Sequence, residues 1–192
     1  MHPALRVLAI LIDPAAEWPR IEKEPDDPPY LLIRYVAPLA LIPSVCGFIG
    51  ACVIGVLMPG AGPLRAPLLA GIFGAIFGYL ESFALILLLA LIVSLAAPLF
   101  GGRRNFANAL KLTAYSYTPV WLTGIFLLLP GLRFLVLTGF YGVYIFAAGL
   151  PLLMKSSKEK TPSFAALIVV LACALTFIAA ALQGALFRTP GL

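Results

Sequence analysis

The fold is decided by the stretch PLLAGIFGAIFGYLESFALILLLALIVSLAAPLF, residues 67–100, in which Glu81 is the only charged residue. At 1.5 Å per residue, a helix of this length is longer than the roughly 30 Å hydrocarbon core of a bilayer. Two membrane-spanning helices would need about forty residues. We therefore expect one long helix that is tilted or protrudes from the membrane, ended by Gly101-Gly102.

The whole chain shares this apolar character. Of its 192 residues, 62% are apolar and 11% are charged, and the mean hydropathy is +1.05. Soluble domains are about 45–50% apolar and 25% charged, so a soluble fold of this size would lack the polar residues to cover its surface. The apolar residues also come in segments. We expect an all-α fold, a polytopic transmembrane helix bundle that forms one domain.

Five apolar segments predict five membrane spans, joined by short turns at 59–63 and 130–131. Residues 1–34 precede them as a cytoplasmic or interfacial segment, and residues 35–187 form the transmembrane domain. The spans lie at about 35–58, 67–100, 112–129, 132–154 and 162–187.

Two short helices are expected in the N-terminal segment. The apolar run 5–12 is too short to span a bilayer and lacks a small-residue cleavage pattern, so we expect a helix in the membrane interface rather than a cleaved signal. Asp13-Pro14 is typical of an N-cap followed by proline at the first helical position. On the helix that follows, Trp18 and Ile21 share a face that we expect to rest on the lipid headgroups.

The basic residues predict the orientation in the membrane. Ten of the thirteen Lys and Arg residues fall in segments that five spans place on one side. This asymmetry predicts a cytoplasmic N-terminus and an external C-terminus, and it gives no reason to expect nucleic acid binding. The ten are Arg6, Arg20, Lys23, Arg34, Arg103, Arg104, Lys111, Lys155, Lys158 and Lys160, against Arg65, Arg133 and Arg188.

Small residues recur at intervals of four in three of the predicted spans. Such stripes allow helix backbones to approach closely inside lipid, where water does not drive association. They predict a tight bundle. Alternatively, one of the stripes forms the contact surface of a homodimer. The stripes are Gly47, Ala51 and Gly55; Gly74, Gly78 and Ser82, preceded by Ala70; and Ala172, Thr176, Ala180 and Gly184.

Glu81 is the one acidic residue at membrane depth. A charged side chain there costs roughly 2.5–3.5 kcal/mol on insertion scales, which makes a proton or cation site the functional interpretation. The structural alternative is a neutral carboxyl group that is hydrogen-bonded across helices to Tyr115, Tyr117 or Gln183. Either way, its position beside the Gly74, Gly78 and Ser82 stripe favours a protein-facing side chain.

An unusual polar stretch, AYSYTPVW, occupies residues 114–121. Pro119 lacks an N–H group and so frees the carbonyl of Tyr115, which Ser116 or Thr118 is expected to satisfy. The stretch predicts a locally kinked helix, and Tyr115, Tyr117 and Pro119 are candidates for a notch that binds a partner or a lipid.

Catalytic and metal-binding patterns are missing from the sequence. Its single histidine is His2, and it has no paired acids, GxSxG, P-loop or HExxH motif. Its cysteines, Cys46, Cys52 and Cys173, lie in apolar runs without CxxC spacing. We expect no enzyme activity, metal site, cofactor or disulfide.

Several short motifs occur in order along the chain: DPAAEWPRI (13–21), YVAPLALIP (35–43), FIG (48–50), GG (101–102), AYSYTPVW (114–121), LP (129–130) and GLP (149–151). Together they resemble the Yip family of Ypt/Rab-GTPase-interacting membrane proteins, and most closely its bacterial branch. The resemblance implies a five-span fold with a cytoplasmic N-terminus, here in a bacterial inner membrane. The eukaryotic relatives bind Rab-type GTPases, but their Asp-Leu-Tyr-Gly-Pro motif is missing here, so GTPase binding is not expected.

Two functions fit these observations. One is a non-enzymatic, membrane-organising or partner-binding protein, which the resemblance, the stripes and the missing catalytic groups favour. The other is a small channel, transporter or lipid-translocating protein that uses Glu81. Its motivation is the buried acid and the proline-broken third span.

Overall fold

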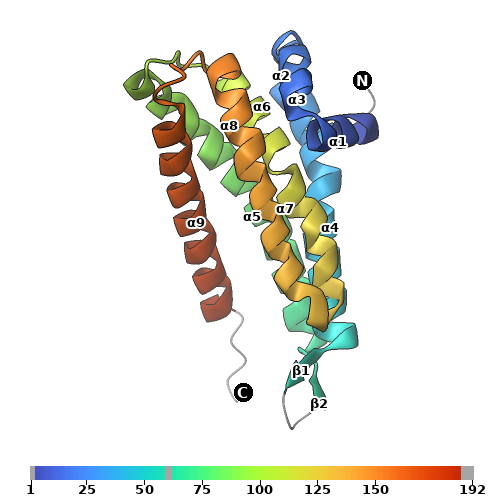
Figure 1. Ribbon diagram of the computed structural model, residues 1–192. Helices are drawn as coiled ribbons and strands as arrows, with labels where there is room; N and C mark the ends of the chain where they lie inside the picture. Colours follow the sequence, from blue (N-terminus) through green and yellow to red (C-terminus); the bar gives the residue numbers. More distant parts are fainter. Residues whose placement is uncertain (1–2, 59–61, 187–192) are drawn as a thin grey trace.

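The structure is a computed structural model that describes residues 3–58 and 62–186, and it is almost entirely helical (Figure 1). Three helices form the N-terminal segment: α1 (Pro3–Ile12), α2 (Pro14–Glu22) and α3 (Pro28–Leu31). The Asp13 carboxylate accepts a hydrogen bond from the Ala16 N–H at 3.0 Å, so the predicted N-cap of α2 is confirmed. Asp27 caps α3 in the same way, through the Tyr30 N–H.

Helical stretches run along the bundle after α3, and in Figure 1 the chain passes back and forth along it, with some passes built from two or more consecutive stretches. Two turns widen into π-helix and three tighten into 3₁₀-helix. In chain order the elements are η1 (Leu32–Val36, π), α4 (Ala37–Phe48), η2 (Ile49–Ile54, π), α5 (Leu68–Ala96), η3 (Ala97–Phe100, 3₁₀), α6 (Phe106–Ser116), α7 (Thr118–Thr123), η4 (Gly124–Leu128, 3₁₀), η5 (Pro130–Phe140, 3₁₀), α8 (Tyr141–Leu153) and α9 (Thr161–Leu186).

Within the described residues, four helices are long and apolar enough to cross a membrane: Pro28–Ile54, Leu68–Phe100, Gly131–Leu153 and Thr161–Ala185. The single long helix predicted over residues 67–100 is confirmed. The all-α bundle is confirmed as well, but the described residues hold four such helices where five spans were predicted, and the predicted third span is the one that differs. Residues 112–129 form no continuous helix, because α6 ends before Pro119 and the chain continues as the short α7 and η4.

The first span also differs at both ends from the predicted 35–58. It begins earlier because Pro28 and Pro29 start α3 at its first positions instead of breaking a helix. It ends earlier because Gly55 adopts a φ of 90°, which terminates the helix. A short antiparallel hairpin follows, in which β1 (Val56–Met58) pairs with β2 (Gly62–Leu64). Of the turn predicted at 59–63, residues 59–61 lie outside the described residues, as does the end of the fifth span at Phe187.

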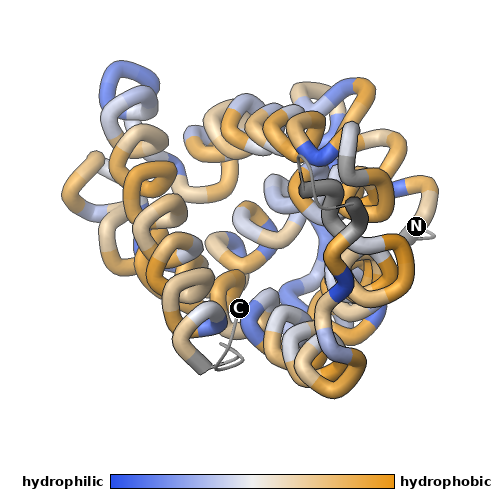
Figure 2. Tube along the Cα trace, turned by 90° about the horizontal axis from the view of Figure 1, so that it is seen from below, coloured by the Kyte–Doolittle hydropathy of each residue, from blue (hydrophilic) through white to orange (hydrophobic). Residues whose placement is uncertain are grey.

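Large apolar side chains cover the outside of the bundle. Figure 2 views the molecule end-on and shows hydrophobic residues along the outer faces of its helices. Exposed apolar surface on this scale is typical of contact with lipid. Representative exposed residues are Leu69, Phe73, Leu80, Phe134, Val170 and Phe177.

The N-terminal helices are part of this bundle. Trp18 is 1% exposed and Ile21 fully buried, and the Trp18 indole N–H donates to the Ile145 carbonyl of α8 at 3.0 Å. The expectation that these side chains rest on lipid headgroups is therefore wrong. Gly149 provides the reason: a Cβ atom there would lie 2.5 Å from the Trp18 ring, so only glycine leaves room for the indole.

Helix α9 has buried side chains near its start only and stands to one side of the bundle (Figure 1). Near its start, Phe164 is fully buried and stacks on Phe100 with ring centroids 4.5 Å apart. Beyond Ile168, no described side chain of α9 is buried. The Gln183 amide nevertheless ties the far part of α9 to α5 by donating to the Gly74 carbonyl at 3.1 Å. This loose packing leaves open spaces on both sides of α9.

Candidate binding sites in the helix bundle

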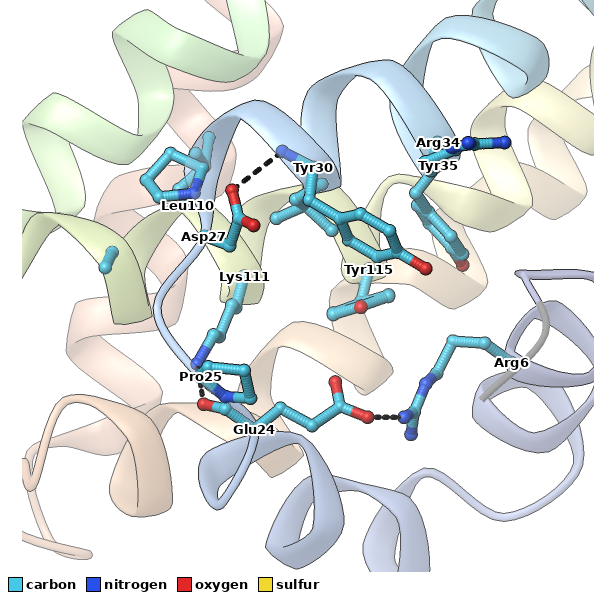
Figure 3. A pocket seen from close by; sticks show the side chains of 13 residues that line it. Arg6, Glu24, Pro25, Asp27, Tyr30, Arg34, Tyr35, Leu110, Lys111 and Tyr115 are labelled. Atoms are coloured by element: carbon cyan, nitrogen blue, oxygen red, sulfur yellow. Dashed lines mark hydrogen bonds and ion pairs between the residues drawn. The ribbon is translucent and has the colours of Figure 1, made fainter.

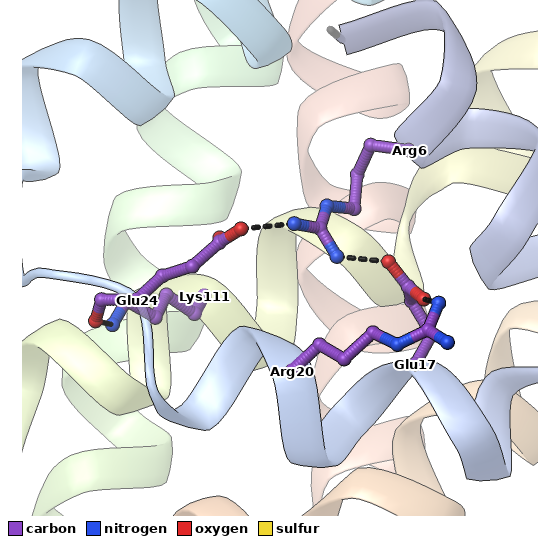
Figure 4. A network of polar contacts seen from close by, with 5 residues as sticks. All are labelled: Arg6, Glu17, Arg20, Glu24 and Lys111. Atoms are coloured by element: carbon purple, nitrogen blue, oxygen red, sulfur yellow. Dashed lines mark hydrogen bonds and ion pairs between the residues drawn. The ribbon is translucent and has the colours of Figure 1, made fainter. Parts of the chain in front are cut away.

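A buried ion cluster fixes the N-terminal segment (Figure 4). Arg6 of α1 pairs with Glu17 of α2 and with Glu24, and Arg20 pairs with Glu17 at 3.1 Å. Arg6 is 4% exposed and Glu17 is 1% exposed. Because buried charges are costly unless paired, each of these two groups offsets the cost of burying the other.

Further ion pairs join this segment to the basic residues of the bundle. Lys111 of α6 donates to the Asp26 carboxylate and to the Glu24 carbonyl, both at 2.7 Å. Lys155, in the loop before α9, pairs with Glu22. Lys111 and Lys155, which the sequence pattern assigns to one side of the membrane, therefore also hold the N-terminal segment against the helices.

A polar pocket of about 380 Å³ lies between the N-terminal segment and α6 (Figure 3). The Tyr35 and Tyr115 rings meet edge to face in its wall, with centroids 4.6 Å apart. The Arg6 guanidinium lies 5.9 Å from the centre of the Tyr115 ring, within cation–π range. Of the charged residues that line the pocket, Arg6, Lys111 and Glu24 are already paired with one another or with neighbours.

Pro119 breaks the helix, as expected, and hydroxyl groups repair the break. The Thr118 Oγ1 donates to the Tyr115 carbonyl at 2.7 Å, which confirms Thr118 as the group that satisfies this carbonyl. Since that hydroxyl has a single hydrogen, the Tyr35 hydroxyl, 2.7 Å away, must donate to Thr118. The kink is thereby tied to the first span, and Tyr115 is directed toward the polar pocket.

Tyr117 and Pro119 lie apart from Tyr115. Tyr117 packs edge to face on Trp121, with centroids 5.5 Å apart, and lines a different cavity. Pro119 is buried at the start of α7, close to Gly142 of α8. The structure therefore does not bring the candidate residues Tyr115, Tyr117 and Pro119 into one notch.

Glu81 lines a groove of about 700 Å³ between α4, α5 and α9, which we call the α4–α5–α9 groove. The carboxyl group is partly exposed, and no hydrogen bond or ion pair to it is found among residues 3–58 and 62–186. Gln183 bonds to Gly74 instead, and Tyr115 lies with Arg6 at the polar pocket. Among the described residues, Glu81 therefore forms no hydrogen bond with Tyr115, Tyr117 or Gln183, the three partners expected for it.

The predicted small-residue stripes line the same groove. Close packing was expected along them, but a Cβ atom at Gly184 would meet nothing within 4 Å, and at Gly78 only Ser44 at 4.0 Å. Gly55 lies elsewhere, where it ends the first span. The stripe residues in the groove are Gly47, Ala51, Ala70, Gly74, Gly78, Ser82, Ala180 and Gly184.

A second space, the α8–α9 cleft, has a volume of about 520 Å³ and lies between α9, α8 and the α6–α7 break. Its walls are mainly apolar. The Ser116 Oγ lies in this wall, buried and without a hydrogen-bond partner in the described part of the chain.

The sequence matches a known family. A model of the Yip1 domain matches residues 8–181, which is most of the chain. The chain belongs to the Yip1 domain family. No curated protein and no solved structure matches it. The resemblance drawn from the short motifs is thereby confirmed, and the protein is a multi-pass membrane protein of this family.

The Yip1 match begins at residue 8, inside α1, so it covers most of the segment predicted as a separate N-terminal part. The buried Trp18 and the ion cluster agree with this extent. Sequence reasoning missed Arg6, Glu17 and Glu24 as interacting residues. The available signal was the concentration of six acidic residues in 13–27, close in sequence to the basic residues Arg6, Arg20 and Lys23.

Proposed function

We propose that this Yip1-domain protein is a non-enzymatic membrane-organising protein that binds one transmembrane helix of a partner membrane protein in the α4–α5–α9 groove. The observation that carries this proposal is Glu81, whose carboxyl group faces the groove without a hydrogen-bond partner among the described residues. Placing a carboxyl group at membrane depth is costly, and a polar residue on an incoming helix would reduce that cost.

The groove wall supports a helix as the occupant. Its small residues expose helix backbone, and close backbone approach is how helices associate in lipid. Gly184 and Gly78 leave this surface uncovered, as their open Cβ positions show. The partner helix should therefore carry its own small residues and one Ser, Thr, Asn or Gln that reaches Glu81.

A partner of different sequence fits the groove better than a second copy. A twofold dimer through this surface would set one groove against another, because such interfaces use the same patch on both subunits. Two concave surfaces leave a void between them. A homodimer through the groove is therefore an outcome to test rather than the proposal.

The proposal also includes a bacterial inner membrane, with the N-terminus in the cytoplasm. In support, the N-terminal segment and the two basic loops lie at one end of the bundle, opposite the hairpin (Figure 1). At that end the Arg103 N–H donates to the Met154 carbonyl at 2.7 Å, and Lys155 pairs with Glu22. A cluster of basic loops is typical of the cytoplasmic side. GTPase binding is not part of the proposal.

Photo-crosslinking in native membranes tests the groove. A benzophenone side chain at Ala75, inside the groove, should capture a discrete partner. The same group at Ile76, the next residue on the outer face of α5, should label only lipid and random neighbours. Glu81→Leu should weaken the Ala75 adduct by about tenfold or more, since a hydrogen bond to a carboxyl group is lost.

Three results separate the possibilities in this experiment. A discrete heterologous adduct that depends on Glu81 supports the proposal. An adduct with the mass of two chains shows a homodimer, and equal random labelling at Ala75 and Ile76 rejects a groove partner.

A second candidate function rests on the same unpartnered Glu81. A carboxyl group beside a 700 Å³ groove could carry protons or cations, or sit on a lipid path. Purified protein in liposomes should then produce flux, and Glu81→Gln should change its rate by tenfold or more if the carboxyl group exchanges the proton. Ser82→Ala, one residue along in the groove wall, is the matched control. Liposomes that stay tight to protons, cations and lipids would reject this function.

A further inference from the structure

The α8–α9 cleft contains a buried hydroxyl group that the protein leaves unsatisfied. Ser116 is 6% exposed, lines the cleft, and its Oγ has no hydrogen-bond partner within the described residues. A buried hydroxyl without a partner is costly, and most such groups in proteins are paired. A group from outside the chain would remove this cost.

Other hydroxyl groups in the same wall are already satisfied. Thr113 Oγ1 donates to the Ala109 carbonyl at 2.8 Å, and Thr176 Oγ1 donates to the Ala172 carbonyl at 2.9 Å. Each bonds within its own helix. The Tyr117 hydroxyl also lines the cleft and is hydrogen-bonded to Thr176 of α9. Ser116 lies at the end of α6, beside the Pro119 break, and among the described hydroxyl groups that line the cleft it is the one without a hydrogen-bond partner.

The rest of the cleft favours an apolar occupant. A bound water needs two to four polar partners, and this wall offers few. The volume of about 520 Å³ falls within the range of roughly 300–1,000 Å³ that is usual for ligand sites. The main apolar lining residues are Leu89, Val120, Phe140, Val143, Phe146 and Phe177.

The cleft is open to the surrounding membrane. α9 is fixed near its start by Phe164, but beyond Ile168 none of its described side chains is buried. Phe177 on α9 is 76% exposed, and Leu137 on η5 is 64% exposed, so the rim itself faces lipid. A lipid chain could enter sideways from the bilayer.

The lining also distinguishes this cleft from the α4–α5–α9 groove. The groove is lined by small residues that suit a helix backbone, whereas the cleft is lined by large Phe, Val and Leu side chains. Bulky side chains keep a helix backbone at a distance. A flexible chain can follow their irregular surface.

We propose that the α8–α9 cleft binds one acyl chain of a membrane lipid, whose ester carbonyl accepts a hydrogen bond from the Ser116 hydroxyl. The hydroxyl donates the hydrogen bond and the ester oxygen accepts it. The interaction is non-covalent. This lipid site is distinct from the groove around Glu81, with Ala180 of α9 as the one described residue that lines both spaces, and the lipid proposal does not depend on a partner helix in the groove.

Photolabelling with a defined lipid tests the site. The full chain is reconstituted in vesicles of phosphatidylethanolamine and phosphatidylglycerol that contain a trace of phosphatidylethanolamine with a diazirine in its acyl chain. After illumination, adducts should concentrate on cleft-lining residues of α8 and α9. Ser116→Ala should reduce this labelling roughly twofold to tenfold, the effect of one neutral hydrogen bond.

Two pairs of variants make the result specific. Thr113→Val removes a cleft hydroxyl that is already bonded to its own helix, and it should leave labelling unchanged. Ala172→Phe fills the cleft and should remove most of the labelling, whereas Ala174→Phe adds the same ring to the exposed face of α9 and should not.

The proposal is overturned if adducts spread evenly over the exposed outer faces and none of these variants changes them. If Ser116→Ala labels like the unaltered protein, the ester contact is rejected. The Ser116→Ala variant should fold normally, because the hydroxyl group that it lacks has no partner among the described residues. It therefore keeps the test decisive even if the Ala172→Phe variant does not fold.

Discussion

Replacing Arg6 with methionine should destabilise the protein by about 3–5 kcal/mol, the usual cost of removing one partner of a buried ion pair. The substitution leaves Glu17, which is 1% exposed, as a buried carboxylate that has lost its most buried counterion. Thermal unfolding of the purified protein in detergent measures the loss. Proteolysis should meanwhile cut the N-terminal segment first, since the cluster holds α1 and α2 together.

Arg20→Met is the matched control. Arg20 also pairs with Glu17, but its side chain is 69% exposed, and exposed ion pairs contribute only about 0–1 kcal/mol. The double variant Arg6→Met with Glu17→Met should recover most of the stability, because it removes both buried charges. If Arg6→Met unfolds no more easily than Arg20→Met, the cluster is not what fixes the N-terminal helices.

Features that depend on neighbouring residues were predictable from the sequence. The long helix over 67–100 follows from uninterrupted apolarity. The Asp13 cap and the Thr118 bond to the Tyr115 carbonyl each join residues three positions apart. Such contacts are decided by local chemistry, so a single sequence contains the information for them.

Contacts between distant helices were not predictable in the same way. Lys111 and Asp26 are 85 positions apart, and Trp18 and Ile145 are 127 apart. Their pairing depends on the rotation and height at which two helices pack, which composition and periodicity do not define. For the same reason, the sequence correctly suggested stripes of small residues without showing that several of them line an open groove.

The third span shows where hydropathy alone misleads. Residues 112–129 are apolar enough to suggest a span, and Pro119 was recognised as a point of disruption. In the structure that disruption is stabilised from outside, by the Tyr35 hydroxyl on the first span and by the close approach of Gly142. A broken helix at membrane depth is tolerated when neighbouring groups satisfy its backbone, and that information lies in other segments.

Gly149→Leu should expel Trp18 from the bundle. The ideal Cβ position at Gly149 already lies 2.5 Å from the Trp18 ring and 2.7 Å from the Leu112 side chain, and the rigid indole cannot yield within this space. The loss should approach the roughly 3–5 kcal/mol typical of removing a buried tryptophan, and the hydrogen bond to the Ile145 carbonyl should break.

Fluorescence can follow this change directly, because the chain has two tryptophans, Trp18 and Trp121. In a Trp121→Phe background only Trp18 emits. Gly149→Leu should then shift the emission to longer wavelengths and expose the indole to a water-soluble quencher. Gly184→Leu is the control on α9, where a side chain would meet nothing within 4 Å and both stability and emission should stay close to the parent. If Gly149→Leu leaves both the emission and the unfolding temperature unchanged, α2 does not depend on the Gly149 surface. The N-terminal helices would then not be part of the bundle core.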